Sequence, residues 1–503
     1  MADNLFQRFR DAVTDPGRKL LLAPDRPPLT IREAFDMAAR FAHVLSRLGV
    51  KPGDRVAVQV EKSPEALILY FACLRAGAVY LPLNTGYTPT ELAYFVADAE
   101  PRLLVCSPSN RESIAATLPD IRILTLGDNG QSGSLVTAAA QESPDFEDAP
   151  VSMNDLASIL YTSGTTGRSK GAMLTHGNLI SNASSLAQAW RFSQSDVLLH
   201  ALPIFHIHGL FVATNVTMLA GARIILLSRF DLDMIFAALP DATVMMGVPT
   251  FYTRMLQDSR LNRNCTRYMR LFVSGSAPLL AETHRAWFER TGHAILERYG
   301  MTETGMNTSN PYEGPRLPGS VGLPLPGVEV RIAAKDGQAL ARGEIGMIEV
   351  RGPNVFKGYW RMPEKTAAEF RTDGFFVTGD LGMIDAQGYL HIVGRDKDLI
   401  ITGGFNVYPK EIEQLIDEVP GVEEAAVVGL PHADFGEGVT AFVVRKGGAD
   451  LSAIDILEAL QGKLARFKHP KRVIFVDQLP RNTMGKVQKS AMRDAYGGLY
   501  ARD

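Results

Sequence analysis

Apolar runs of strand length alternate with amphipathic stretches of helix length through about the first 330 residues of the chain. The run DRVAVQV (54–60) predicts a strand, and SPEALILYFACLRAGA (63–78) predicts a helix that ends near Gly77. The strand pattern recurs in VYLPLN, RLLVC, LASILY (156–161), ARIILL (222–227), ATVMMGV (242–248) and RLFVSG (270–275). This alternation predicts an α/β fold of mainly parallel sheets flanked by helices. Such sheets bind ligands at loops beyond the carboxyl ends of their strands.

The pattern changes near residue 327, where short alternating strands are joined by Gly and Asp turns. The runs VEVRIA, GMIEVRG, FFVTGD and YLHIVG predict a small barrel-like or antiparallel β subdomain. The later segment YPKEIEQLIDEV predicts a helix with Pro409 in its first turn, and three further strands complete a compact unit. We therefore predict a large N-terminal domain over residues 1–395 and a small C-terminal α+β domain over residues 396–503.

Composition excludes several classes of protein. The formal net charge of −3 over 503 residues argues against a nucleic-acid binder that depends on bulk positive charge. The longest apolar runs, such as ALILYFACL, fall far short of the roughly 20 residues that span a bilayer, and the first residues contain no apolar signal core. The three cysteines lie far apart and indicate reduced thiols: Cys73, Cys106 and Cys265. We expect a cytoplasmic protein with small-molecule substrates, no nucleic-acid partner and no membrane partner.

The stretch YTSGTTGRSKG (161–171) consists of Thr, Ser or Gly at eight of its eleven positions. Its glycines allow tight turns, and its hydroxyls and exposed backbone N–H groups can surround phosphate oxygens, with Lys170 adding positive charge. The stretch is not a Walker A loop, because no Gly-Lys-Ser/Thr follows a glycine at the required spacing. Its position after a predicted buried strand favours phosphate binding over the alternative, a flexible surface loop.

Three further motifs carry candidate functional groups. ERYGMTET offers Glu303 beside Thr302, a carboxylate that can hold Mg²⁺ directly or through water, or else a surface charge. TGD and GRDKD supply Asp380 and Arg395, which suit ribose hydroxyls and phosphate oxygens, or else form a structural salt bridge. PRNTMGKVQK carries Lys486, which by itself predicts only a basic surface turn.

Together, YTSGTTGRSKG, ERYGMTET, TGD, GRDKDLIITGGFNVYP and PRNTMGKVQK resemble the adenylate-forming superfamily of acyl- and aryl-CoA synthetases, luciferases and adenylation domains. The motifs occur in the superfamily's order, and the resemblance covers nearly the whole chain. The chain is most similar to the malonyl-CoA synthetases, through HALPIFHIHGLF, MGVPTFYTR, GMTETGMNTSNPYEG and GPNVFKGYWRMPEKT. Ile207 departs from that group, which carries a threonine between the two histidines, so the preferred size at C2 of the acid stays open.

The resemblance implies an AMP-forming reaction with ATP and Mg²⁺ as cofactors and coenzyme A as co-substrate. An acid would attack the α-phosphorus of ATP to give an acyl-adenylate, and the CoA thiol would then expel AMP. By the same resemblance, the β- and γ-phosphates are held by Thr162, Ser163, Gly164, Thr165, Thr166 and Lys170. The metal is held by Thr162 and the catalytic Glu303, next to Thr302. The resemblance also implies that the adenine is framed by Gly275, Ser276, Ala277, Pro278, Arg298 and Tyr299, and that the ribose is held by Asp380 and Arg395.

Lys486 matches the superfamily's adenylation lysine, which bridges the attacking carboxylate and the α-phosphate. Acetylation by a lysine acetyltransferase would cancel its charge, so such a regulatory partner is an open possibility. The C-terminal domain is expected to be mobile and to rotate between the two half-reactions, with Lys397 at the hinge. Gly403 and Gly404 then lie where the pantetheine arm of CoA passes.

Malonate would bring a second carboxylate into the acyl pocket, and a buried carboxylate requires a cation or strong donors. We expect Arg254 to be this clamp, with Arg285 as the second choice; either could instead be a surface arginine. By resemblance, His206 is the catalytic gate of the pocket, and Met306 and Ile207 line it near C2 of the acid. The H-x-H pair of this segment is too small a set of ligands for zinc.

The leading hypothesis is an AMP-forming malonyl-CoA synthetase that also accepts methylmalonate. Alternatives are a CoA ligase for another small or aryl acid, a stand-alone adenylation enzyme that loads a carrier protein, a luciferase-like oxygenase and a nucleotide-binding relative without activity. The presence of both Lys486 and Glu303 argues against the last of these. Diphosphate release tested with several acids separates the ligases.

Overall fold

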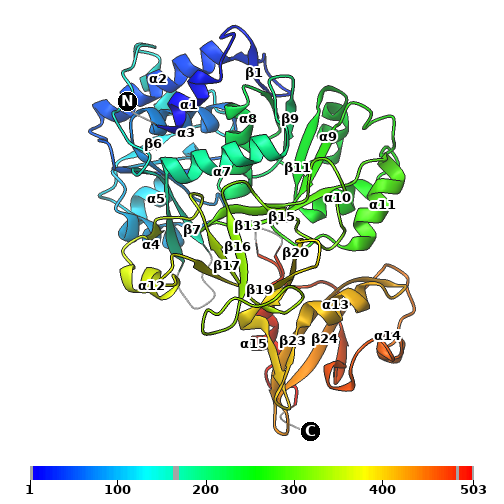
Figure 1. The fold of residues 1–503 in the computed structure, drawn as a ribbon. Coiled ribbons are helices and arrows are strands. Elements are labelled where there is room, and N and C mark those ends of the chain that lie inside the picture. Colours follow the sequence, from blue (N-terminus) through cyan, green and yellow to red (C-terminus); the bar gives the residue numbers. More distant parts are fainter. Residues whose placement is uncertain (1–3, 163–168, 483–485, 501–503) are drawn as a thin grey trace.

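The computed structural model describes residues 4–162, 169–482 and 486–500 (Figure 1). Of the predicted phosphate loop, Ser163, Gly164, Thr165 and Thr166 lie outside these residues. Within the described ranges, no helix is long and apolar enough to cross a membrane.

The first sheet of the N-terminal domain has seven strands, and its centre is parallel. Their order is β18 (Gly358–Tyr359), β8 (Lys170–Thr175), β7 (Leu156–Thr162), β4 (Val79–Pro82), β3 (Arg55–Gln59), β5 (Leu103–Cys106) and β6 (Ile123–Thr125). Only the pairs β7–β8 and β8–β18 are antiparallel. Lys170 and Gly171, at the end of the glycine-rich stretch, begin β8, and helix α7 begins at His176 directly after that strand.

The second sheet has nine strands and is also mainly parallel. Their order is β15 (Leu323–Pro324), β14 (Gly305–Ser309), β13 (Leu296–Met301), β12 (Leu271–Ser274), β11 (Val244–Gly247), β9 (Val197–His200), β10 (Arg223–Leu226), β1 (Lys19–Leu22) and β2 (Leu29–Thr30). The strands β13, β14 and β15 are antiparallel to one another at one edge, and β2 is antiparallel to β1 at the other. The predicted α/β class is confirmed by these two sheets.

Helices cover both sheets, and the sequence explains where they begin. Thr30 and Glu33 form a reciprocal capping box at the start of α2, and Ser63 caps α3 ahead of Pro64. All residues of α3 are buried, which explains why this helix is apolar on every face. The helices of this domain are α1 (Leu5–Asp11), α2 (Ile31–Arg47), α3 (Pro64–Arg75), α4 (Pro89–Ala99), α5 (Arg111–Thr117), α6 (Ser134–Ala139), α7 (His176–Ala189), α8 (Asn215–Leu219), α9 (Leu232–Ala238), α10 (Pro249–Leu256), α11 (Ala281–Thr291) and α12 (Pro363–Ala368).

The predicted barrel-like or antiparallel subdomain forms a four-stranded antiparallel sheet. Its order is β16 (Glu329–Ala333), β17 (Gly346–Arg351), β19 (Phe376–Ile384) and β20 (Leu390–Arg395). The C-terminal unit has five strands, β22 (Phe405–Val407), β21 (Ile400–Thr402), β24 (Gly436–Arg445), β23 (Val422–His432) and β25 (Arg472–Phe475). Its helices are α13 (Pro409–Asp417), α14 (Ala453–Leu460) and α15 (Lys489–Tyr496). The proposed boundary at residues 395/396 lies between the end of β20 and the start of β21.

The C-terminal unit lies at one end of the N-terminal domain, next to β19 and β20 (Figure 1). Lys446 and Glu282 form an ion pair of 3.7 Å between the two units, and both side chains are more than half exposed. An exposed pair of this kind contributes little stability, so it is a weak bond between units that are expected to move.

Candidate active site

The candidate site is built where four separate segments end near one another. These are the β7–β8 hairpin, the turn between β13 and β14, the β19–β20 hairpin and the loop after β9. Thr162, the last residue of β7, pairs in register with Lys170, the first residue of β8. The hydroxyl of Thr162 lies 3.4 Å from the backbone oxygen of Lys170. The hairpin therefore fixes both ends of the predicted phosphate loop.

Glu303 is buried in the turn between β13 and β14, with only 6% of its surface exposed. Its Oε1 accepts a hydrogen bond of 3.0 Å from the hydroxyl of Tyr359, and burial raises the pKa of the carboxyl. The same tyrosine hydroxyl lies 2.7 Å from Oε2 of Glu369, whose Oε1 is 3.4 Å from Nζ of Lys170. Tyr359 and Glu369, to which no motif had assigned a role, therefore link Glu303 to Lys170.

Asp380 joins the β19–β20 hairpin to the nucleotide motif of β13. Its Oδ2 accepts a hydrogen bond of 2.6 Å from the hydroxyl of Tyr299, and its Oδ1 lies 3.3 Å from Nε of Arg395. Asp380 and Arg395 face each other in the β19–β20 register. The structure therefore brings together three residues that were predicted to bind the nucleoside, although their contacts to a nucleotide stay a prediction.

Arg298 on β13 is a buried cation that forms no ion pair with the described part of the chain. It is 4% exposed, and neither its Nε nor its Nη2 has a hydrogen-bond partner among the described residues. Burial lowers the pKa of the guanidinium from its usual 12.5 to about 9. Gly275 makes room for this group, since a Cβ there would lie 2.3 Å from Cζ of Arg298. A buried polar group is normally paired, so these free donors point to a missing anion.

Two neutral histidines lie close to Arg298. Burial lowers the pKa of His206 to about 3, with nearby Lys486 adding to the effect, and burial beside Arg298 lowers the pKa of His208. Nδ1 of His208 lies 3.2 Å from the hydroxyl of Ser276, while Nε2 of each histidine has no partner in the described part of the chain. Since both rings are uncharged at neutral pH, the positive charge next to them comes from Arg298, which acts on His208, and from Lys486, which acts on His206.

Ser276 and its neighbours form the turn after β12. Ser276 adopts a φ of +72°, in the left-handed region that costs a residue other than glycine about 1–2 kcal/mol. Gly275 is buried, Ala277 is half-buried and Pro278 is exposed. The predicted adenine frame is therefore a strained turn, and the structure places Arg298 and His208 against it.

Lys486 brings the C-terminal unit into the site. The half-buried ammonium lies close enough to Arg395, Asp380 and Glu303 to interact with each of them electrostatically. Burial, with a smaller contribution from Arg395, lowers the pKa of Lys486 to about 8, although the carboxylates of Asp380 and Glu303 oppose the change. The distant motifs of the two units thus converge on one set of charges.

A buried lysine fixes the loop that carries His206. Nζ of Lys62 donates to the backbone oxygens of His200 and Leu202, at 2.8 Å each, and lies 3.1 Å from Nδ1 of His200. Nε2 of His200 is 3.0 Å from the backbone oxygen of Gly209. Because a carbonyl only accepts, Nε2 carries the hydrogen and Nδ1 accepts from Lys62. Lys62 therefore ties the end of β9 to the π-helical turn His208–Thr214.

Met306 and Ile207, the residues expected near C2 of the acid, both pack against apolar side chains. Met306 on β14 is 1% exposed, and its backbone N–H and oxygen are held by the side-chain amide of Asn182 at 3.0 and 2.8 Å. A Cβ on Gly300 would lie 2.6 Å from Cε of Met306, which places that methyl group next to the chain leading from Tyr299. Ile207 is half-buried and packs against the core of the first sheet.

Arg254 and Arg285, the two predicted clamps, are both exposed. Arg254 on α10 is exposed, and its guanidinium lies over the ring of Phe230 with Cζ 4.9 Å from the ring centroid. Arg285 on α11 is exposed as well, and it affects only His284 among the described titrating groups with shifted pKa values. Their role as the carboxylate clamp stays a prediction, and the buried Arg298 is a third candidate for it. Sequence reasoning had assigned Arg298 to the adenine.

Gly403 and Gly404 form the two-residue turn between β21 and β22. Their φ values are +56° and +81°, the combination that a tight hairpin of this kind requires. No heavy atom lies within 4 Å of a Cβ built on Gly404, so the turn faces open space. Lys397, the predicted hinge, is exposed in the short helical turn Asp396–Asp398. The contribution of these residues to thioester formation stays a prediction.

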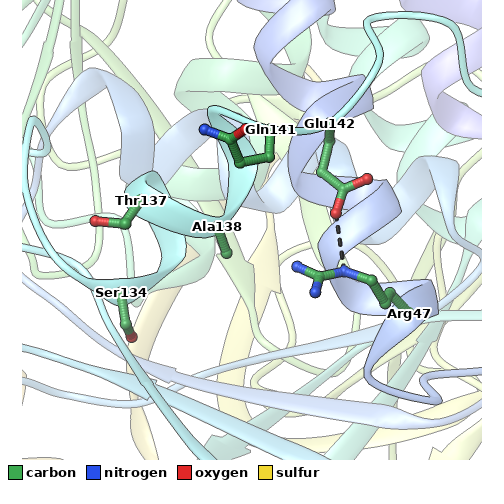
Figure 2. Close-up of a pocket in the computed structure, with 6 residues that line it drawn as sticks. All are labelled: Arg47, Ser134, Thr137, Ala138, Gln141 and Glu142. Atoms are coloured by element: carbon green, nitrogen blue, oxygen red, sulfur yellow. Dashed lines mark ion pairs between the residues drawn. The ribbon is translucent and has the colours of Figure 1, made fainter.

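A surface pocket of about 560 Å³ lies elsewhere, between α2 and the end of α6 (Figure 2). Nε of Arg47 and Oε1 of Glu142 form an ion pair of 2.8 Å at its rim. Its lining residues are Arg47, Ser134, Thr137, Ala138, Gln141 and Glu142, none of which belongs to the predicted site. Among the described residues, no group of three or more His, Cys, Asp or Glu side chains is arranged so that it could hold a metal ion.

The fold and this convergence of charges define an adenylate-forming enzyme. The chain matches the AMP-binding enzyme family over residues 9–360 and the AMP-binding enzyme C-terminal domain over residues 411–486. It therefore belongs to the AMP-binding enzyme family, and the predicted superfamily and ligase class are confirmed.

Two solved structures and two relatives show which enzymes this chain is similar to. The structure matches that of ATP-bound MatB from Rhodopseudomonas palustris with a TM-score of 0.97 and 60% identity, over 99% of this chain and 100% of that chain. The apo form of the same protein gives a TM-score of 0.87. The chain is 38% identical to a feruloyl-CoA synthase of Amycolatopsis sp over 93% of this chain and 94% of the relative. It is 35% identical to a mitochondrial malonate–CoA ligase of Mus musculus over 92% and 86%.

Proposed function

We propose that this protein is a cytoplasmic, AMP-forming malonate–CoA ligase that uses ATP and coenzyme A. The observation that carries the proposal is the buried guanidinium of Arg298, whose Nε and Nη2 have no partner among the described residues. Malonate would supply the missing anion with one carboxylate while the other reacts. A monocarboxylic acid would leave the cation buried and unpaired.

An aryl-CoA ligase is the second candidate, because a feruloyl-CoA synthase is among the relatives. An aryl acid brings its ring, rather than a second carboxylate, to the end of the acyl pocket. That would leave Arg298 without a counterion, in the company of the neutral His206 and His208. The charge of the pocket therefore favours a dicarboxylic acid.

In the first half-reaction, one carboxylate oxygen of malonate forms a bond to the α-phosphorus of ATP, and the bond to diphosphate breaks. Lys486 is the cation that can neutralise this meeting of anions, since it lies among Arg395, Asp380 and Glu303. Lys170 and Thr162 stand at the ends of the phosphate loop and would hold the β- and γ-phosphates. Tyr299, Asp380 and Arg395 would hold the nucleoside.

Mg²⁺ is implied by the superfamily, and the residues present fit it. Glu303 is a buried carboxylate, burial raises the pKa of its carboxyl, and oxygen ligands suit this metal. Glu303 and the hydroxyl of Thr162 would hold the ion, which would neutralise phosphate charge. The acid and the nucleotide are positioned by the chain's own residues, Arg298 and Asp380 among them.

In the second half-reaction, the CoA thiolate forms a bond to the acyl carbon, and AMP leaves with the electron pair of the broken C–O bond. We propose that the C-terminal domain, residues 396–503, rotates about Lys397 to bring the turn at Gly403 and Gly404 to the site. The higher TM-score to ATP-bound than to apo MatB supports the view that the present arrangement serves adenylation. Neither the described contacts nor the comparisons support the predicted acetyltransferase partner at Lys486.

The test is AMP formation with ATP, Mg²⁺ and CoA across malonate, methylmalonate, succinate, acetate and benzoate. Malonate should give the highest kcat/KM, and acetate should be lower by about 30- to 5,000-fold, the range expected for leaving a buried charge unpaired. ADP as the product, or equal use of acetate and malonate, would contradict the proposal. Faster turnover of benzoate would favour the aryl-acid alternative.

A further inference from the structure

Tyr359 joins two carboxylates that the function above does not connect. Its hydroxyl lies 3.0 Å from Oε1 of Glu303 and 2.7 Å from Oε2 of Glu369. The tyrosine is held by the short strand β18, in register with Ala172 of β8, and by the Thr366 hydroxyl, which accepts from its backbone N–H at 2.9 Å. One hydroxyl hydrogen serves one acceptor at a time, and the shorter contact marks Glu369 as its main acceptor.

Glu369 also holds Lys170, which the proposed function assigns to the phosphates of ATP. Oε1 of Glu369 lies 2.7 Å from Nζ of Lys365, its neighbour one helical turn away, and 3.4 Å from Nζ of Lys170. Lys170 also lies over the ring of Tyr359, 4.3 Å from the centroid. Oε1 of Glu369 therefore takes part in two ion pairs, and the one with Lys170 is longer than the one with Lys365.

We propose that Glu369 is a positioning residue for Lys170. It holds the ammonium at the mouth of the phosphate loop when no polyphosphate is bound, competes with the phosphates of ATP for it, and takes it back as diphosphate leaves. The inference rests on the proposed function, because Lys170 must bind phosphate for the competition to exist.

The geometry suits an exchange of partners. The side chains of Lys170 and Glu369 are 17% and 20% exposed, so Lys170 can reach a ligand without a rearrangement of the core. Glu369 keeps Lys365 and the Tyr359 hydroxyl as partners after Lys170 departs, so its carboxylate is not left unpaired. The phosphates of ATP carry more negative charge than one carboxylate, so they can displace Glu369 from Lys170. Because Glu369 competes for the same ammonium, it lowers the affinity of Lys170 for the phosphates.

The experiment compares Glu369→Gln with the wild-type enzyme. Glutamine keeps the size and an oxygen that accepts from Tyr359 but removes the competing charge. The KM for ATP and the inhibition constant of diphosphate should each fall by about three- to tenfold, the scale of a partly exposed ion pair. The inhibition constant of AMP, which lacks the outer phosphates, should change by less than about twofold, as should the KM for malonate.

Lys365→Met is the matched control, because Lys365 shares the oxygen of Glu369 but is not expected to touch ATP. Its removal leaves Lys170 as the main cation for Glu369, so the KM for ATP and the inhibition constant of diphosphate should rise. Glu369→Asp, which withdraws the carboxylate by one methylene, gives a second test if Glu369→Gln does not fold. It should lower both constants, by less than the glutamine variant would.

The proposal is overturned if Glu369→Gln leaves diphosphate inhibition unchanged or weakens it, if AMP inhibition shifts equally, or if Lys365→Met moves the constants the same way. Failure of the proposed function looks different. In that case the wild-type enzyme itself would release no AMP from ATP with malonate, whatever the variants do.

Discussion

Replacing Arg298 with methionine should stabilise the ligand-free protein while destroying its use of malonate. Methionine is unbranched and apolar, and it can fill most of the space of the arginine stem beside Gly275. The substitution removes a charge whose Nε and Nη2 have no partner among the described residues. Most substitutions of a buried residue destabilise a protein, so a gain in stability would be a distinctive result.

The expected gain follows from the pKa of Arg298. Burial lowers the pKa of Arg298 to about 9, and at about 1.36 kcal/mol per pH unit this corresponds to a penalty of roughly 5 kcal/mol for the charged form. For a base with a lowered pKa, this penalty is fully present below about pH 9 and disappears as the pH rises from about 9 to 12.5. Some of the gain is lost to imperfect packing, so we expect about 1–4 kcal/mol at pH 7.

The assay is urea unfolding of the wild-type protein and Arg298→Met at pH 7, with and without malonate. Malonate should raise the unfolding free energy of the wild type and leave that of the variant unchanged, because it pairs with the charge only when the charge is present. In AMP formation with malonate, the variant should lose about 2–5 kcal/mol of transition-state stabilisation, which lowers kcat/KM by about 30- to 5,000-fold. The value for acetate should fall much less.

Arg254→Met is the control, since that arginine is exposed and should affect neither quantity by more than about 0.5 kcal/mol. The reasoning is refuted if Arg298→Met is less stable than the wild type, or if the variant is stabilised by malonate as strongly as the wild type. Loss of malonate use in Arg254→Met instead would return the clamp to α10.

Four other substitutions probe the rest of the site. Lys486→Ala should slow adenylation by about 100- to 1,000-fold without preventing adenylate binding, and kcat/KM for ATP in the wild type should fall above about pH 8, where Lys486 loses its charge. Lys62→Met should lower kcat/KM for malonate by about 10- to 100-fold and change the KM for ATP by less than about threefold, as expected for a displaced loop. Ile207→Ala should raise methylmalonate use relative to malonate by about tenfold in competition assays. Gly404→Val should slow thioester formation in single-turnover assays but spare diphosphate release; equal losses would contradict its role.

The parallel sheets could be predicted because their strands are short apolar runs separated by helices with clear boundary signals. The helix predicted over residues 63–78 is found as α3 (Pro64–Arg75), with Ser63 as its cap. The segment after the glycine-rich stretch was harder, because KGAMLT has neither a helical nor a strict strand period. It becomes a strand by pairing with β7, and Gly171 is needed there because a Cβ would lie 2.9 Å from Ile159.

Site residues could be predicted where a sequence motif is typical of one kind of chemistry. They could not be predicted where the chemistry depends on burial by residues distant in the sequence. Asp380, Arg395 and Tyr299 could be selected from their motifs, and the structure places them in contact. The unusual state of Arg298 depends instead on Gly275, which directly follows β12 and leaves room for the buried guanidinium. Glu369 was missed for the same reason, because its partner Lys170 is distant in the sequence.

The two ends of the site differ in how their charges are balanced before a ligand binds. At the phosphate end, the cation Lys170 already has an internal anion in Glu369, so a ligand must displace it, and binding is weakened but release is easier. At the proposed acid end, Arg298 has no such anion among the described residues, and its burial costs the fold free energy that a bound anion would recover. Discrimination against monocarboxylic acids therefore does not require a steric barrier. It follows from a destabilised empty pocket, and tightening that pocket with an internal carboxylate would make the enzyme more stable and less selective.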